Sequence, residues 1–158
     1  MGIIATSSDT TFTCGPEVLY DFVTDPRNWP KTYPGSGGIE GVEDLPLEVG
    51  DVWSEAGRLG DLDCRYTWRL VTAERPWRWE FRSVGALAHD PDDHSGGFTG
   101  ITTISYTFTE SGGGVTLFHR SMTTEVPKHG RMPAQVVAAH EPFAIDAYHD
   151  AVAAALAN

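Results

Sequence analysis

The stretch that decides the fold is RMPAQVVAAHEPFAIDAYHDAVAAALAN, residues 131–158. It is rich in alanine, contains no glycine, and repeats its apolar side chains at the spacing of one helix face: Ala138, Ile145, Tyr148, Val152 and Leu156. We therefore predict a long helix that closes the chain, kinked by Pro142 in its first half. A helix with one apolar side needs another layer to cover that side.

The chain upstream supplies the covering layer, because residues 10–126 are mainly strands and turns by pattern. The segments at about 63–72 and 77–84 alternate, with Tyr66, Trp68, Trp79 and Phe81 on one face and arginines on the other. That pattern is typical of an antiparallel sheet with one dry and one wet face. We expect an α+β fold, in a single domain over residues 1–158.

Composition excludes several classes of partner. Of the 158 residues 41% are hydrophobic, and the net charge of −11 argues against binding to nucleic acid, whose phosphates need Lys and Arg. No apolar run is long enough to insert into a membrane. The N-terminus has no basic region before an apolar run, so we expect a cytoplasmic protein with Cys14 and Cys64 as free thiols, either a monomer or a homodimer.

A second informative stretch is PEVLYDFVTDPRNWP, residues 16–30. Pro16 suits a first helical turn, Asp25-Pro26 ends that helix, and residues 28–34 predict a very short second helix. The motif and the order of elements resemble the START-like (SRPBCC) helix-grip superfamily, in its polyketide cyclase/dehydrase branch. The resemblance implies a curved antiparallel sheet of about six to seven strands around the C-terminal helix, two short helices after strand 1, and an apolar cavity between sheet and helix.

The resemblance places Tyr66, Trp68, Trp29 and Tyr33 in that cavity. An alanine-rich helix cannot fill the concave side of a wide sheet, which also favours a cavity over a solid core. The strand patterns and the closing helix add further candidates for ligand contact: Trp79, Phe81, Tyr106, Phe108, Leu117, Ser121 and Phe143. The key arginine of the aromatase/cyclases corresponds here to Thr72, which counts against the same cyclisation chemistry.

His119 is the first candidate for acid–base catalysis, with Tyr66 and His140 after it. His119 shares a strand face with Leu117 and Ser121, and the family register favours this face as the inner one. The opposite face is nearly as apolar, and it would place Arg120 inside, where a guanidinium binds a carboxylate or polarises a carbonyl. A structural role for the histidines remains the alternative.

Two glycine-flanked loops are candidates for gating the cavity, as in the hormone-receptor members of the superfamily. The first is residues 57–61, with Arg58 and Leu59, and the second is residues 85–97, with His89 and His94. The His89–His94 segment has ligand-type residues for a divalent metal, but an acidic solvated loop explains them as well, and we expect no metal. No phosphate or dinucleotide motif is present, so we expect no cofactor.

Three hypotheses for function follow. In the first, a carrier binds a hydrophobic, aromatic or polyketide-like small molecule. The second is a polyketide cyclase/dehydratase of secondary metabolism that uses the same cavity and relies mainly on orientation of its substrate. A third is a protein-interaction or stress-response module, against which Arg65, Arg69, Arg78 and Arg82 speak because they make the wet face charged.

Overall fold

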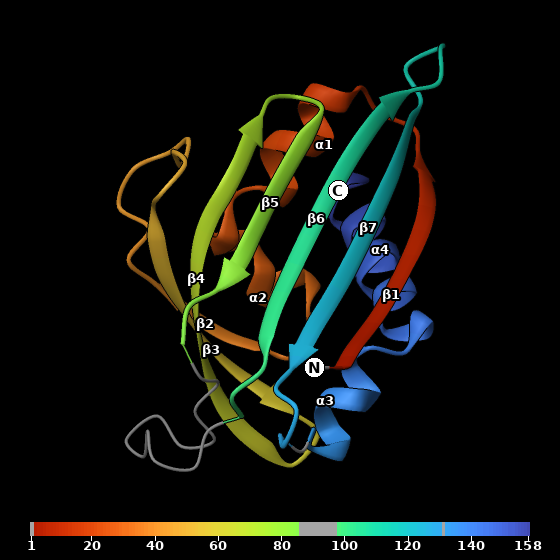
Figure 1. Ribbon diagram of the computed structural model, residues 1–158. Helices are drawn as coiled ribbons and strands as arrows, with labels where there is room; N and C mark the ends of the chain where they lie inside the picture. Colours follow the sequence, from red (N-terminus) through yellow and green to blue (C-terminus); the bar gives the residue numbers. More distant parts are fainter. Residues whose placement is uncertain (1, 86–97, 131) are drawn as a thin grey trace.

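The computed structural model describes residues 2–85, 98–130 and 132–158. Its elements are β1 (Gly2–Phe12), α1 (Pro16–Val23), the 3-10 helix η1 (Pro26–Asn28), α2 (Trp29–Thr32), β2 (Ser36–Glu40), β3 (Val52–Leu59), β4 (Leu62–Glu74), β5 (Arg78–Ser83), β6 (Ile101–Glu110), β7 (Thr116–Val126), α3 (Ala134–Ala139) and α4 (Pro142–Leu156). The strands form one antiparallel sheet in the order β1-β7-β6-β5-β4-β3-β2. The sheet curves around the helices, which lie on one face of it (Figure 1). The predicted helix-grip architecture is confirmed.

We call the face of the sheet that meets the helices the inner face. The buried residues of β3 to β7 lie mostly at alternate positions on this face, as along β6, where every second residue from Thr102 to Phe108 is buried. The outer face carries hydroxyl and charged side chains, including the exposed Arg69, Arg78 and Arg82. The dry and wet faces predicted from β4 and β5 are therefore confirmed.

The first short helix after β1 lies where the sequence predicts, and the second, expected over residues 28–34, spans Trp29–Thr32 directly after η1. Pro16 occupies the first turn of α1, and the helix ends at Val23, before Asp25-Pro26. The side chain of Asp25 then accepts a 3.0 Å hydrogen bond from the backbone N–H of Arg27 and caps η1. The end of α1 and the cap of η1 together turn the chain so that α2 presents Trp29 to the inner face.

The closing segment forms two helices, whereas we predicted one kinked helix. Pro142 lies in the first turn of α4, where its missing N–H costs no hydrogen bond, and α3 ends before it at Ala139. Ile145, Tyr148 and Val152 are buried on the sheet as predicted. Ala138 is exposed, because the break changes the direction of the chain before α4 begins.

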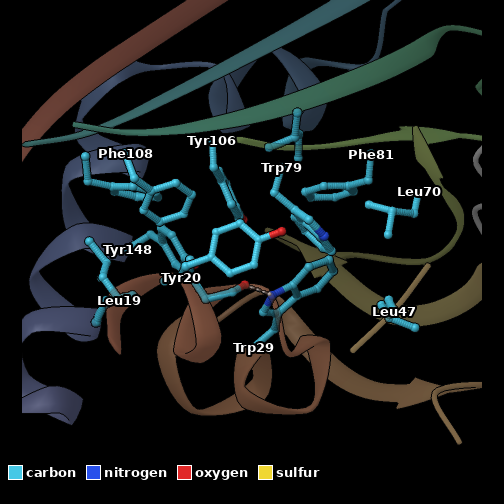
Figure 2. Packing of buried hydrophobic residues seen from close by; sticks show 14 of the residues in the cluster. Leu19, Tyr20, Trp29, Leu47, Leu70, Trp79, Phe81, Tyr106, Phe108 and Tyr148 are labelled. Atoms are coloured by element: carbon cyan, nitrogen blue, oxygen red, sulfur yellow. Dashed lines mark hydrogen bonds between the residues drawn. The ribbon is translucent and has the colours of Figure 1, made fainter. Parts of the chain in front are cut away.

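Aromatic side chains make up most of the core. Figure 2 shows Trp79, Phe81, Tyr106 and Phe108 of the sheet facing the residues of α1, α2 and α4. Trp53 stacks on Trp79 with ring centroids 5.8 Å apart. Such pairs contribute about 0.5–1.5 kcal/mol each beyond the burial of their surface.

The start of β2 has no clear signal in the sequence. β2 begins at Ser36, which pairs with Gly57 of β3, and continues through Gly37 and Gly38. Glycine carries no side chain whose pattern could indicate a strand. None of the described helices is long and apolar enough to cross a membrane.

Candidate functional site

A cavity lies between the inner face of the sheet and the C-terminal helices. Its volume, counted as the space that the centre of a water molecule can occupy, is about 60 Å³. One water molecule needs about 10–15 Å³ of such space, so the cavity has room for several. Strands β3 to β7 supply most of its wall, and α2 with the following Tyr33, α3 with the following His140, and α4 complete it. It is lined by Trp29, Tyr33, Glu55, Leu59, Tyr66, Trp68, Phe81, Thr102, Ile104, Tyr106, Arg120, Met122, Val136, Ala139, His140 and Tyr148.

Flat aromatic rings form one side of the cavity. The rings of Tyr66 and Trp68 stack, with centroids 4.7 Å apart and an angle of 6° between their planes. Trp68 meets Phe81 edge-on at 5.0 Å, and Trp29 lies 5.1 Å from the same Phe81. Rings held by one another in this way offer a preformed surface for a flat apolar ligand.

A carboxyl group lies in this otherwise aromatic wall. Glu55 projects from β3 and is 6% exposed, and its Oε2 accepts a 2.9 Å hydrogen bond from the indole N–H of Trp68. Burial raises the pKa of Glu55, and the hydrogen bond from Trp68 lowers it to a smaller extent. The carboxyl therefore keeps its proton to a higher pH than a carboxyl in water.

Arg120 enters the cavity from β7. Its guanidinium carbon lies 5.4 Å from the centroid of the Tyr148 ring, a cation–π arrangement. Its Nε is buried and has no hydrogen-bond partner within the described residues. The positive charge of Arg120 lowers the pKa of the tyrosines around it, Tyr33 and Tyr106, although burial outweighs this effect and raises both.

His140 is placed by the break between α3 and α4. Its Nδ1 lies 2.7 Å from the carbonyl oxygen of Val136 and its Nε2 lies 2.6 Å from Oγ1 of Thr124. A carbonyl only accepts, so Nδ1 carries the proton and Nε2 accepts from the Thr124 hydroxyl. The hydroxyl of Thr102, 2.9 Å from that of Thr124, extends the chain to a second residue that lines the cavity. Burial lowers the pKa of His140, which keeps the imidazole neutral.

Tyr66 is buried too deeply to give up its proton near neutral pH. Burial raises its pKa well above the ordinary value, and the nearby Cys64 and Tyr33 raise it further. As a neutral phenol it remains a hydrogen-bond donor. The structure thus brings Tyr66 and His140, both predicted from the sequence, to one cavity together with Leu59 of the first gating segment.

The remaining catalytic candidate, His119, lies outside the cavity. It points to the outer face, where its Nδ1 is 2.7 Å from Oδ1 of the exposed Asp9 on β1. The expectation that its face is the inner one is wrong, because the buried residues of β7, Phe118 and Met122 among them, lie on the opposite face. The alternative that we left open, with Arg120 inside, is correct.

Other ligand candidates also lie outside the cavity. Leu117 and Ser121 share the outer face with His119, and Leu117 is 39% exposed. Phe143, predicted to contact the cavity, is 65% exposed because it falls on the solvent side of α4. Trp79 and Phe108 are buried in the core beside the cavity without lining it.

Of the four residues predicted for the gating segments, the structure places one, Leu59, at the cavity. Leu59 lines the cavity, while Arg58 is exposed and forms an ion pair with Asp63. The tip of this turn reaches α3, where Nε2 of Gln135 donates a 3.0 Å hydrogen bond to Oδ1 of Asp61. His89 and His94 lie outside the described residues.

Several lining residues were missed from the sequence. Glu55 was detectable, since it stands two residues after Trp53 on a strand and so shares its face. Val136 and Ala139 were hidden by the assumption of one continuous helix. Within residues 2–85, 98–130 and 132–158, no three His, Cys, Asp or Glu side chains are grouped so as to hold a metal ion.

The fold is shared with several solved structures. Ara h 8.0201 superposes with a TM-score of 0.71 at 13% identity, over 99% of this chain and 100% of that one. A START superfamily protein from Mycobacterium smegmatis gives a TM-score of 0.70 at 13% identity, covering 97% of this chain and 96% of the other. Ginseng major latex-like protein 151 from Panax ginseng gives 0.68 at 14% identity, over 96% of both chains.

Comparison by sequence identifies the family. A search of curated protein sequences gives no match to this chain. A family model described as polyketide cyclase / dehydrase and lipid transport matches residues 4–158. That match spans nearly the whole sequence and agrees with the curved sheet, the helices and the cavity described above. The chain therefore belongs to the polyketide cyclase / dehydrase and lipid transport family.

Proposed function

We propose that this protein binds a hydrophobic small molecule of aromatic or polyketide type in the cavity between the sheet and helices α3 and α4. The observation that carries the proposal is the wall of fixed rings formed by Trp29, Tyr66, Trp68 and Phe81. A mostly apolar hollow with a few polar groups is the usual form of a small-molecule site. The volume of the cavity favours a compact ligand of one or two rings over a long acyl chain.

The test is a pair of variants on α3. Ala139 lines the cavity, whereas its neighbour Ala138 is exposed, so Ala139→Phe fills the space and Ala138→Phe serves as the matched control. Native mass spectrometry and thermal shifts against one- and two-ring aromatic compounds give the readout. A ligand at about 100 times its Kd should stabilise the protein by about 2.7 kcal/mol.

We expect Ala139→Phe to weaken binding of any hit at least about tenfold, and Ala138→Phe to leave it within about threefold. Equal effects of the two variants would place the ligand elsewhere. If no aromatic compound stabilises the wild-type protein, the proposal is wrong.

A second candidate function is a dehydration or cyclisation of the bound molecule, favoured by the ionisable groups that face the cavity. In a dehydration, a base removes a proton from the carbon beside a carbonyl, the C–O bond of a β-hydroxyl group breaks, and the hydroxyl leaves as water after taking a proton. We propose that the carboxyl of Glu55 gives that proton and that the hydrogen-bonded chain from Thr102 through Thr124 to His140 takes the other.

Product analysis separates the two functions. A ligand recovered unchanged after incubation supports a carrier. A ligand recovered with the loss of one water, or as an isomer, supports an enzyme. In that case Glu55→Gln and His140→Asn should each lower turnover about 10²-fold or more while the bound state persists.

A further inference from the structure

The cavity contains one cationic side chain that has no anionic partner among the described residues. Arg120 is the one cationic side chain among the described lining residues, and Glu55 is the one carboxylic acid. No carboxylate oxygen of the described residues lies within 4.0 Å of the Arg120 guanidinium. Instead, its guanidinium carbon lies 5.4 Å from the centroid of the Tyr148 ring, Tyr106 is a neutral partner beside it, and its Nε is buried without a partner among the described residues.

The pKa shifts of the groups that face Arg120 from the neighbouring elements all favour the neutral forms of those groups. Burial raises the pKa of Glu55 of β3 by more than Trp68, Ser36 and the charge of Arg120 lower it. His140, between α3 and α4, and His149 of α4 are neutral because burial lowers their pKa. Tyr106 of β6 and Tyr148 of α4 are phenols with a raised pKa. The field in the cavity is therefore that of one uncompensated guanidinium.

An uncompensated charge of this kind is costly in an apolar interior, and a bound anion of matching shape removes the cost. A guanidinium presents its N–H groups as a planar fork that fits the two oxygens of a carboxylate, and it also pairs with the single oxygen of an enolate or phenolate. The rings of Trp29, Trp68 and Phe81 line the same cavity and accommodate the apolar part of such a molecule.

We propose that the ligand is an aromatic acid, an apolar ring system with one anionic oxygen group that pairs with Arg120. This inference rests on the proposed binding function and specifies the class of ligand for the same cavity. It makes Arg120 the residue that selects between charged and uncharged molecules of equal shape, and it leaves the apolar wall to supply affinity for both.

The experiment compares 2-naphthoate with 2-naphthamide, which have the same ring system and differ in charge. Isothermal titration calorimetry on the wild-type protein at neutral pH should give at least about tenfold tighter binding of 2-naphthoate, as expected for hydrogen bonds to charged groups. This comparison needs no variant. Equal binding of the two compounds would overturn the inference and leave the proposed function standing, whereas failure of both to bind would overturn both.

Variants then assign the preference to one residue. Arg120→Gln should abolish the preference for 2-naphthoate and change the affinity for 2-naphthamide by less than about threefold, while Arg120→Lys should keep part of the preference because the charge remains. Arg65→Gln on the outer face, which removes a charge paired with Glu40, is the control for a general electrostatic effect. An unchanged preference in Arg120→Gln would overturn the inference.

Glu55→Gln tests whether the carboxyl is the hidden counter-ion of Arg120. If Glu55 does not neutralise Arg120, replacing it by an uncharged amide should not tighten the binding of 2-naphthoate. A gain of tenfold or more would show that Glu55 neutralises Arg120 in the free protein, and it would overturn the inference.

Discussion

The indole N–H of Trp68 points at the buried carboxyl of Glu55, and the 2.9 Å bond between them links neighbouring strands inside the cavity wall. The bond fixes both the plane of the ring and the rotamer of the acid. One donor does not compensate a full negative charge at this depth, so the pair is more stable with the acid protonated.

Glu55→Gln should therefore change how stability depends on pH. The folded pKa of Glu55 is raised, so between the unfolded and folded pKa values the folded state holds a proton that the unfolded state has released. The free energy of unfolding falls as pH rises through that window. We expect the variant to match the wild type near pH 4 and to gain about 1–3 kcal/mol over it by pH 8, measured by urea unfolding. A constant difference across this range would contradict the assignment.

His149 should act in the opposite direction. It is 1% exposed, its Nδ1 lies 2.6 Å from Oγ1 of Thr10, and burial, followed by the charge of Arg120, lowers its pKa to about 4. Between about pH 6.5 and pH 4 the unfolded state binds a proton that the folded state does not, so stability is lost as pH falls through that range. His149→Phe should remove about 2–3 kcal/mol of that loss in unfolding experiments from pH 7 to pH 4.

Thr10→Val is the control for this prediction. It removes the hydrogen bond to His149 but keeps the buried imidazole, so it should keep the loss of stability at low pH. If His149→Phe and the wild type show the same slope, the buried imidazole is not the group that titrates.

Gln135 should affect the rate of ligand exchange more than its affinity. The Gln135–Asp61 hydrogen bond ties the β3–β4 turn to α3, and Leu59 and Val136, close to the two ends of that bond, line the cavity. Gln135→Ala should raise the association and dissociation rates of an aromatic ligand together, by several-fold, in stopped-flow Trp fluorescence. Arg58→Gln is the matched control, since its ion pair with Asp63 stays within the turn. Unchanged rates in Gln135→Ala would show that entry is elsewhere.

His119→Ala should leave both binding and any turnover within about twofold of the wild type. The residue lies on the outer face, where its Nδ1 is 2.7 Å from Oδ1 of Asp9, and even a charged pair at such an exposed place contributes only about 0–1 kcal/mol to stability. The measurement is the titration described for the cavity, repeated on this variant. A large loss of binding would mean that the outer face takes part in the site.

The fold was predictable because its strongest signals are redundant. In β4 and β5 the buried residues are apolar, with Trp68, Trp79 and Phe81 among them, and most of the exposed ones are charged, so only one register fits. The motif at residues 16–30 fixes the first helices through proline and a capping aspartate, both of which act locally. Such signals do not depend on contacts with distant parts of the chain.

The site was less predictable because its decisive features are set by distant contacts. In β7 both faces carry apolar residues, and pairing with β1 and contact with α4 decide that Arg120, and not His119, faces inward. Glu55 breaks the rule that carboxyl groups avoid the interior, so its strand position alone identifies it. Pro142 fits both a kinked helix and the start of a new one, and this ambiguity hid the place of Val136 and Ala139.

The sheet order also has a consequence for synthesis on the ribosome. β1 pairs along its whole length with β7, so that Gly2 meets Val126 and Phe12 meets Thr116. During synthesis β1 therefore stays unpaired until β7, the last strand of this sheet, has been made, and α4, which packs against β1, is made later still. Long-range pairing of this kind slows folding and leaves incomplete sheets open to association with other chains. The polar, threonine- and serine-rich sequence of β1 limits that hazard, because an unpaired strand of this composition is poorly suited to aggregation.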